Sequence, residues 1–177
     1  MALKLPEDAN LRLRAALKQR FHRLRHQGDL IRHTSDSSAW TPSAVPTFKE
    51  YYGSVETLLR HGTSRQHFQY LFNVYAVSTP HGISRSELLA LIQDHVNMAR
   101  EDARLFERTY TWLKKHVPSA TAGHSYDAIA ELLEAHPNQL LDHVHVNLDR
   151  CLAQLEANNT VYCRLPDDLA ILIEQDL

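Results

Sequence analysis

The segment Ser125–Leu177, SYDAIAELLEAHPNQLLDHVHVNLDRCLAQLEANNTVYCRLPDDLAILIEQDL, carries the strongest signal for the fold. Ser125 is a good N-cap for a short helix, because its hydroxyl can accept a backbone N–H of the first turn. His136-Pro137 ends that helix, since the residue before a proline is disfavoured in the α region. A longer helix is then expected from about Gln139 to Asn158-Asn159. The order of short helix, turn and longer helix predicts a helix-turn-helix.

Two alternating apolar runs follow the longer helix and predict a wing. Val161, Cys163 and Leu165 alternate with polar residues, which is typical of a half-buried strand. A turn at 166–168 separates them from a second alternating run at 169–173. Proline followed by two acids is also typical of a helix start. Both readings stay open for residues 169–173, and the wing strand is the favoured one.

Residues 65–117 follow the same order of elements as residues 125–174. A helix, a hard turn at 79–82, a short helix and a longer helix to about 116 succeed one another. Ser84 and Glu87 form a capping box, in which each side chain bonds the other residue's backbone N–H. The sequence therefore predicts a mainly α protein of tandem (winged) helix-turn-helix units with a small C-terminal β-wing. A single all-α bundle is the alternative.

Length and composition set the domain organisation. The chain has 177 residues, of which 44% are apolar, so it forms one domain or two small ones. A segment rich in Ser, Thr and Pro is typical of a linker. We expect the following divisions: a basic amphipathic helical arm at 1–33, a linker at 34–46, a helical unit with the first helix-turn-helix at 47–117, and the C-terminal winged helix-turn-helix at 118–177.

The net charge of −2 hides an asymmetry along the chain. Residues 1–33 hold eight of the nineteen Lys and Arg but three of the twenty-one acids. The cations flank a narrow apolar stripe on the first helix, so phosphate neutralisation could give affinity for nucleic acid. A solvated face on a structural helix, an acidic partner and an anionic membrane surface are the alternatives, the membrane being the least favoured. The candidate nucleic-acid contacts here are Arg12, Arg14, Lys18, Arg20, Arg23 and Arg25.

A second set of candidate contacts lies in the helix that ends near residue 116. Arg100, Arg104 and Arg108 recur every four residues and therefore share one face. They are predicted to meet phosphates, unless Glu101 and Asp102 pair with them along the helix.

The longer C-terminal helix has the opposite character. It carries Asp142, Asp149 and Glu156 against Arg150 alone, and phosphates would repel such a face. We therefore expect the C-terminal unit to bind protein or to dimerise, and expect any phosphate contact elsewhere.

No motif for catalysis, a cofactor or a metal is found. The chain has no glycine-rich phosphate loop and no HExxH zinc motif. His22 and His26 are one helical turn apart, but a structural zinc site needs four ligands and none lies nearby in the sequence. No apolar segment has the length of a membrane span, and no leader is visible. We expect a cytoplasmic protein that is not an enzyme and has no membrane partner.

In size and element order over residues 65–174, the layout is similar to small tandem winged-helix accessory subunits of chromosome-structuring, SMC-type ATPase complexes. The resemblance implies a subunit without catalysis that binds an elongated partner and sometimes DNA. The expected function is a non-enzymatic adaptor that contacts a larger protein subunit and, non-specifically, DNA; a homodimer is a further expectation. A dimeric DNA-binding transcriptional regulator and an enzyme with an unrecognised active site are the alternatives.

Overall fold

The computed structural model describes residues 7–27, 47–79, 82–96, 103–119 and 122–162. Over these residues the chain is mainly helical, and its β structure is confined to isolated bridges. The predicted mainly α class is confirmed. The described residues fall into two compact units. Unit 1 lies between residues 53 and 151, and unit 2 combines residues before 53 with residues after 151.

Unit 2 contains α1 (Glu7–Gln27), the first residues of α3 (Phe48–His61) and the chain from Leu152 onward in α8 (Leu148–Tyr162). The ring of Phe21 in α1 meets the ring of Tyr51 in α3 at a centroid distance of 5.4 Å. The apolar stripe predicted for the first helix is confirmed as its buried face. The residues predicted for this stripe, Leu13, Leu17, Phe21 and Leu24, are all buried, and Ala16 is buried with them.

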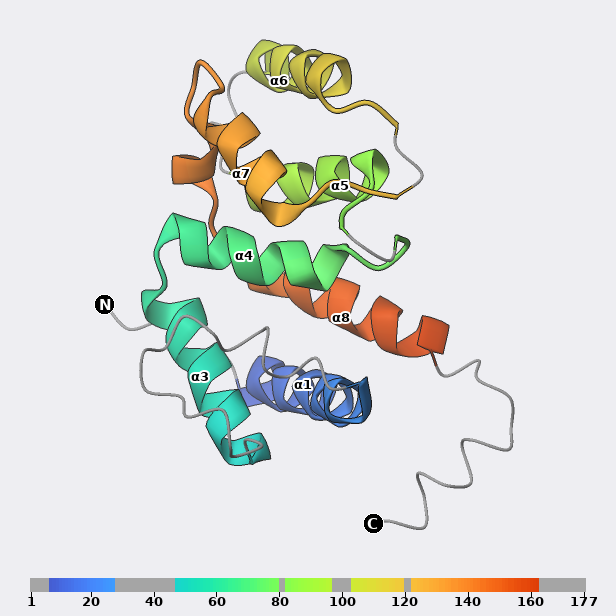
Figure 1. Cartoon of the computed structure of the whole chain (residues 1–177). Helices are drawn as coiled ribbons and strands as arrows, with labels where there is room; N and C mark the ends of the chain where they lie inside the picture. Colours follow the sequence, from blue (N-terminus) through green and yellow to red (C-terminus); the bar gives the residue numbers. More distant parts are fainter. Residues whose placement is uncertain (1–6, 28–46, 80–81, 97–102, 120–121, 163–177) are drawn as a thin grey trace. The chain divides into compact units, whose positions relative to one another are not determined.

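Unit 1 is built from four α-helices and a short 3₁₀ helix, together with the ends of α3 and α8 that belong to it. Contacts join α4 to α5, α5 to α6, and both α4 and α7 to the 3₁₀ helix, so that α5 lies between α4 and α6 (Figure 1). The bounds are α4 (Ser64–Tyr75), α5 (Arg85–His95), α6 (Ala103–His116), α7 (Tyr126–Glu134) and η1 (Leu140–His143).

Local side-chain chemistry sets the starts of these helices. Ser84 caps α5, and the reciprocal bonds of the capping box with Glu87 are both present, as predicted. The Ser125 hydroxyl accepts the N–H of Ala128 at 3.4 Å and caps α7, also as predicted. Each of these helices therefore begins directly after a serine whose side chain bonds an N–H group of the first turn, which has no partner within the helix.

Two isolated bridges hold the ends of α5. Before the helix, Ile83 and His124 exchange N–H to C=O bonds of 2.9 and 2.8 Å. A side chain on the preceding Gly82 would collide with the carbonyl of His124, so this close approach requires glycine. After the helix, Val96 pairs with Val144. These bridges fix α5 between chain segments that are distant in sequence.

The longer C-terminal helix differs from its prediction at its start. Gln139 is left-handed, η1 follows, and α8 begins at Leu148 rather than near Gln139. The later start is caused by hydrogen bonds to α5. The N–H of His145 donates to the carbonyl oxygen of His95 at 2.9 Å, and the N–H of Asn147 donates to the Nδ1 of His95 at 3.0 Å. These donors cannot also close helical turns, so the chain stays extended until Asn147 starts α8.

The end of α8 is also different from the prediction. The helix continues through Asn158 and Asn159 to Tyr162, so the expected helix end and the start of the expected strand at Val161 are wrong. Both asparagines are buried, and the Asn159 amide donates to the carbonyl of Ala16 in α1 at 3.4 Å. The Asn159 amide thus has a hydrogen-bond partner in α1, and the two asparagines lie within the helix instead of ending it in the left-handed conformation that Asn can adopt after a helix. The rest of the predicted wing, residues 163–177, lies outside the described residues.

Candidate phosphate-contacting surface

Three of the cations predicted as nucleic-acid contacts on α1 are engaged inside unit 2. The Arg12 guanidinium donates to both carboxylate oxygens of Glu156 at 2.9 to 3.1 Å. Arg23 donates to the carbonyl of Asn158 at 3.4 Å, and Arg20 is only 5% exposed. These three side chains help to attach α1 to its own unit.

The other α1 cations differ among themselves. Arg14 is exposed and its guanidinium carbon lies 5.9 Å from the ring centre of Tyr52, within cation–π range. Lys18 is exposed and, among the described residues, forms no ion pair. The side chain of Arg25 lies outside the described residues. In α1, Arg14 and Lys18 are thus the exposed cations without an ion-pair partner in the described chain.

A straight row of cations runs along α6. Arg104, Arg108 and Lys115 stand at positions i, i+4 and i+11, which places them on one face over about 16 Å of helix axis. All three are exposed, while Thr109 and Leu113 on the opposite face are 1% exposed. We call Arg104, Arg108 and Lys115 the α6 row. Within the described ranges none of them forms an ion pair, and Arg100 falls outside those ranges.

The C-terminal end of α6 is held by an aromatic contact. The indole of Trp112 stacks on the His116 ring at 4.2 Å and meets the edge of His136, just after α7, at 4.6 Å. Burial, together with the nearby His116, lowers the pKa of His136 below its usual value. His136 is therefore neutral at pH 7, and the contact fixes α6 relative to the end of α7.

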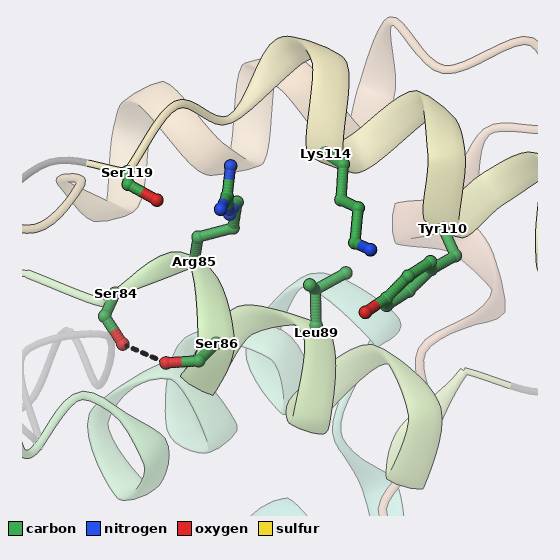
Figure 2. Close-up of a pocket in the computed structure, with 7 residues that line it drawn as sticks. All are labelled: Ser84, Arg85, Ser86, Leu89, Tyr110, Lys114 and Ser119. Atoms are coloured by element: carbon green, nitrogen blue, oxygen red, sulfur yellow. Dashed lines mark hydrogen bonds between the residues drawn. The ribbon is translucent and has the colours of Figure 1, made fainter.

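A hollow of about 300 Å³ opens between the first turn of α5 and the adjoining face of α6. Two cations enter it from facing helices, since Arg85 reaches from α5 toward α6 and Lys114 from α6 toward α5 (Figure 2). The ammonium of Lys114 lies 4.1 Å from the ring centre of Tyr110. We call this the α5–α6 hollow; it is lined by Ser84, Arg85, Ser86, Leu89, Tyr110, Lys114 and Ser119.

Glu87 is the acid of the first turn of α5, and its carboxylate is directed to the backbone. Its Oε1 accepts the N–H groups of Val77 and Ser78 at 3.1 and 2.7 Å, and its Oε2 accepts that of Ser84 at 2.8 Å. Burial raises the pKa of Glu87, but these hydrogen bonds outweigh it and keep the pKa below its usual value. The carboxylate is ionised at pH 7, and it stabilises the helix start without lining the hollow.

A buried polar network lies at the other end of α5. His95 is 0% exposed, and its Nδ1 accepts the N–H of Asn147 at 3.0 Å. The proton of the neutral ring is therefore on Nε2, which donates to the Tyr75 hydroxyl at 3.0 Å, and that hydroxyl donates to Asp94 at 2.8 Å. Burial lowers the pKa of His95 to about 4. With every polar atom of the ring bonded, this network has the character of a core hydrogen-bond chain.

Neither a metal group nor a membrane helix is found in the part of the chain that is described. No three His, Cys, Asp or Glu side chains are placed there to hold a metal ion. None of the helices described is long and apolar enough to cross a membrane. Comparisons with protein-family models, with curated proteins and with solved structures found no match to this chain.

Sequence reasoning anticipated part of this surface and missed the rest. Arg104 and Arg108 were expected on one face, and the structure adds Lys115 to them. Arg85 and Ser119 were not singled out, because their approach to Lys114 depends on the packing of α5 against α6. The one available signal was Arg85 itself, a cation directly after the N-cap Ser84, where the helix dipole disfavours positive charge.

Proposed function

We propose that this chain is a non-enzymatic accessory protein of a DNA-associated complex that contacts the phosphate backbone of duplex DNA through the α6 row. The observation that supports the proposal is the row itself, with Arg104, Arg108 and Lys115 exposed on one face and without ion-pair partners among the described residues. Cations in such a row neutralise successive phosphates and release counterions, which gives affinity without base recognition.

The composition of the row favours positioning over sequence readout. No described residue of α6 is Asn or Gln, the side chains that read adenine in the major groove. We expect binding that varies little with DNA sequence, and a larger protein subunit as the partner that directs the chain to its place of action.

Fluorescence anisotropy with a labelled duplex tests the nucleic-acid part. If the three cations of the row each contact one phosphate, affinity falls roughly forty-fold between 50 and 200 mM salt. The triple variant Arg104→Gln/Arg108→Gln/Lys115→Gln should lose most of this affinity and most of its salt dependence. Unchanged binding by the triple variant would refute the role of the α6 row.

Two further measurements separate the proposal from its rivals. Competition with unrelated duplexes should displace the labelled duplex equally well, whereas strong preference for one sequence would indicate a transcriptional regulator. Affinity purification of the full chain at native expression should recover a larger subunit in stoichiometric amount. Recovery of the chain as a homodimer without another subunit would contradict the accessory role.

A further inference from the structure

We propose that the α5–α6 hollow is a binding site for a single phosphomonoester group carried by a small ligand or by the end of a nucleic-acid strand. The site is lined by other residues than the α6 row, so this inference does not rest on the proposed function. The argument comes from the charge, the hydrogen-bond donors and the size of the hollow.

The charge of the hollow matches a dianion. Arg85 and Lys114 come from different helices and extend into the space between them (Figure 2). Neither forms an ion pair with a residue that the structure describes. A phosphomonoester carries a charge of about −1.5 to −2 at pH 7, whereas a backbone diester carries one negative charge. Two cations that share one hollow therefore favour the monoester, while separated cations in a row favour diesters.

The donors of the hollow match the terminal oxygens of such a group. The Arg85 guanidinium and the Ser119 hydroxyl lie on one side of the hollow, and the Lys114 ammonium lies on the other side, beside Tyr110 (Figure 2). The Ser84 hydroxyl is not available, because it donates to the Glu87 carboxylate at 2.8 Å. The Ser86 hydroxyl lines the same hollow, but it is the donor in its 3.1 Å bond to Ser84 Oγ, because the Ser84 proton is directed to Glu87. The planar guanidinium can bond two terminal oxygens, and the Lys114 ammonium can bond a third from the facing helix.

The size and floor of the hollow restrict the rest of the ligand. Its volume of about 300 Å³ is at the lower end for small-molecule sites. Leu89 and the ring of Tyr110 supply an apolar patch beside the cations. The acid of the first turn, Glu87, is bonded to the backbone at 77, 78 and 84 and does not line the space. A phosphate on a small organic group fits these limits.

Titration by ¹H–¹⁵N NMR tests the site on the full chain. Methyl phosphate is the monoester probe and dimethyl phosphate the diester probe, in low-chloride buffer at pH 7.5. Saturable shifts at Arg85, Ser86 and Ser119 are expected with methyl phosphate, with affinity about tenfold higher than for dimethyl phosphate. Arg85→Gln and Lys114→Gln should each weaken methyl phosphate binding by about tenfold. Lys18→Gln, which removes an exposed cation that does not line the hollow, should leave it unchanged.

Several results would overturn the site. They are equal binding of the two probes, an equal loss in Lys18→Gln, or the absence of saturable shifts in the wild type. A duplex with a 5′-phosphate, compared with one bearing a 5′-hydroxyl, then identifies the source of the group. A gain from the 5′-phosphate that disappears in Arg85→Gln indicates a strand end, and methyl phosphate binding without such a gain indicates a small ligand. If the α6 row fails its own test, the methyl phosphate result still decides this inference.

Discussion

The helices α1 and α6 are both rich in cations but use them differently. In α1, Arg12 is paired with Glu156, Arg20 is buried, and Arg23 bonds a backbone carbonyl of α8. In α6, the cations of the row are exposed and have no described acidic partner. The density of positive charge in a sequence therefore does not identify the binding helix. A binding helix is better identified by whether its cations are exposed and whether they already contact groups of the same chain.

The largest expected effect concerns the structural role of α1. Leu17 is 0% exposed, so Leu17→Ala should lower the free energy of unfolding by about 2–5 kcal/mol, measured by urea denaturation. Leu11 on the same helix is 67% exposed and is the matched control, with an expected change within about 0.5 kcal/mol. Equal effects of the two substitutions would mean that α1 is not packed by its stripe.

Acid should weaken unit 1, on which the α6 row stands. His95 has a folded-state pKa of about 4, below its ordinary value of 6.5, so the unfolded chain binds the proton more tightly. The contribution of the neutral His95 to the free energy of unfolding is fully present above pH 6.5. It is lost as the pH falls toward 4, and the total loss is about 3 kcal/mol. Urea denaturation across this range should show the loss in the wild type.

The His95→Gln variant isolates this contribution to the pH dependence. It is expected to be less stable at pH 7.5, because the bonds to Tyr75 and Asn147 are disturbed, and to lose less stability between pH 6.5 and 4. Substitution of the exposed His143 by Gln is the control and should retain the wild-type profile. If His95→Gln and the wild type had parallel profiles, the neutral buried histidine would be the wrong explanation.

Within α1, burial should separate Arg20 from Lys18. Arg20→Gln is expected to destabilise the fold by about 1–3 kcal/mol, since the change disturbs a side chain that is 5% exposed. Lys18→Gln removes the same charge from an exposed position and should change stability by less than about 0.5 kcal/mol. Thermal and urea denaturation of both variants measure this difference. The reverse order would favour Arg20 as a surface contact.

The smallest expected effect is that of the ion pair between Arg12 and Glu156. Both side chains are about half exposed, so a double-mutant cycle with Arg12→Gln and Glu156→Gln should give a coupling of about 0.2–1 kcal/mol that decreases with salt. A coupling of zero at low salt would show that Arg12 is available for other partners, and would reduce the contrast with α6.

The features predicted correctly from the sequence are those that depend on neighbouring residues. The Ser84/Glu87 capping box, the Ser125 cap and the buried stripe of α1 are set by spacings of three and four residues. The errors arose where distant segments compete for the backbone. His95 accepts the N–H groups of residues 145 and 147 and delays α8, and burial of Asn158 and Asn159 extends it.

The candidate sites divide in the same way. The shared face of Arg104 and Arg108 follows from helical periodicity, which the sequence displays. The α5–α6 hollow combines Arg85, Lys114 and Ser119 from three segments, and no local spacing brings them together. The internal use of the α1 cations likewise depends on residues more than a hundred positions away, such as Glu156.

The salt dependence of duplex binding, compared between two triple variants of equal charge, tests the contrast between α1 and α6 most directly. One variant is Arg104→Gln/Arg108→Gln/Lys115→Gln, and the other is Arg12→Gln/Arg20→Gln/Arg23→Gln, which removes the three α1 cations that are engaged within their own unit. The slope of log K against log salt should become shallower by about 2.7 for the α6 variant, because three phosphate contacts are lost, and should remain near the wild-type value for the α1 variant. A slope that changes in the α1 variant and not in the α6 variant would contradict this account.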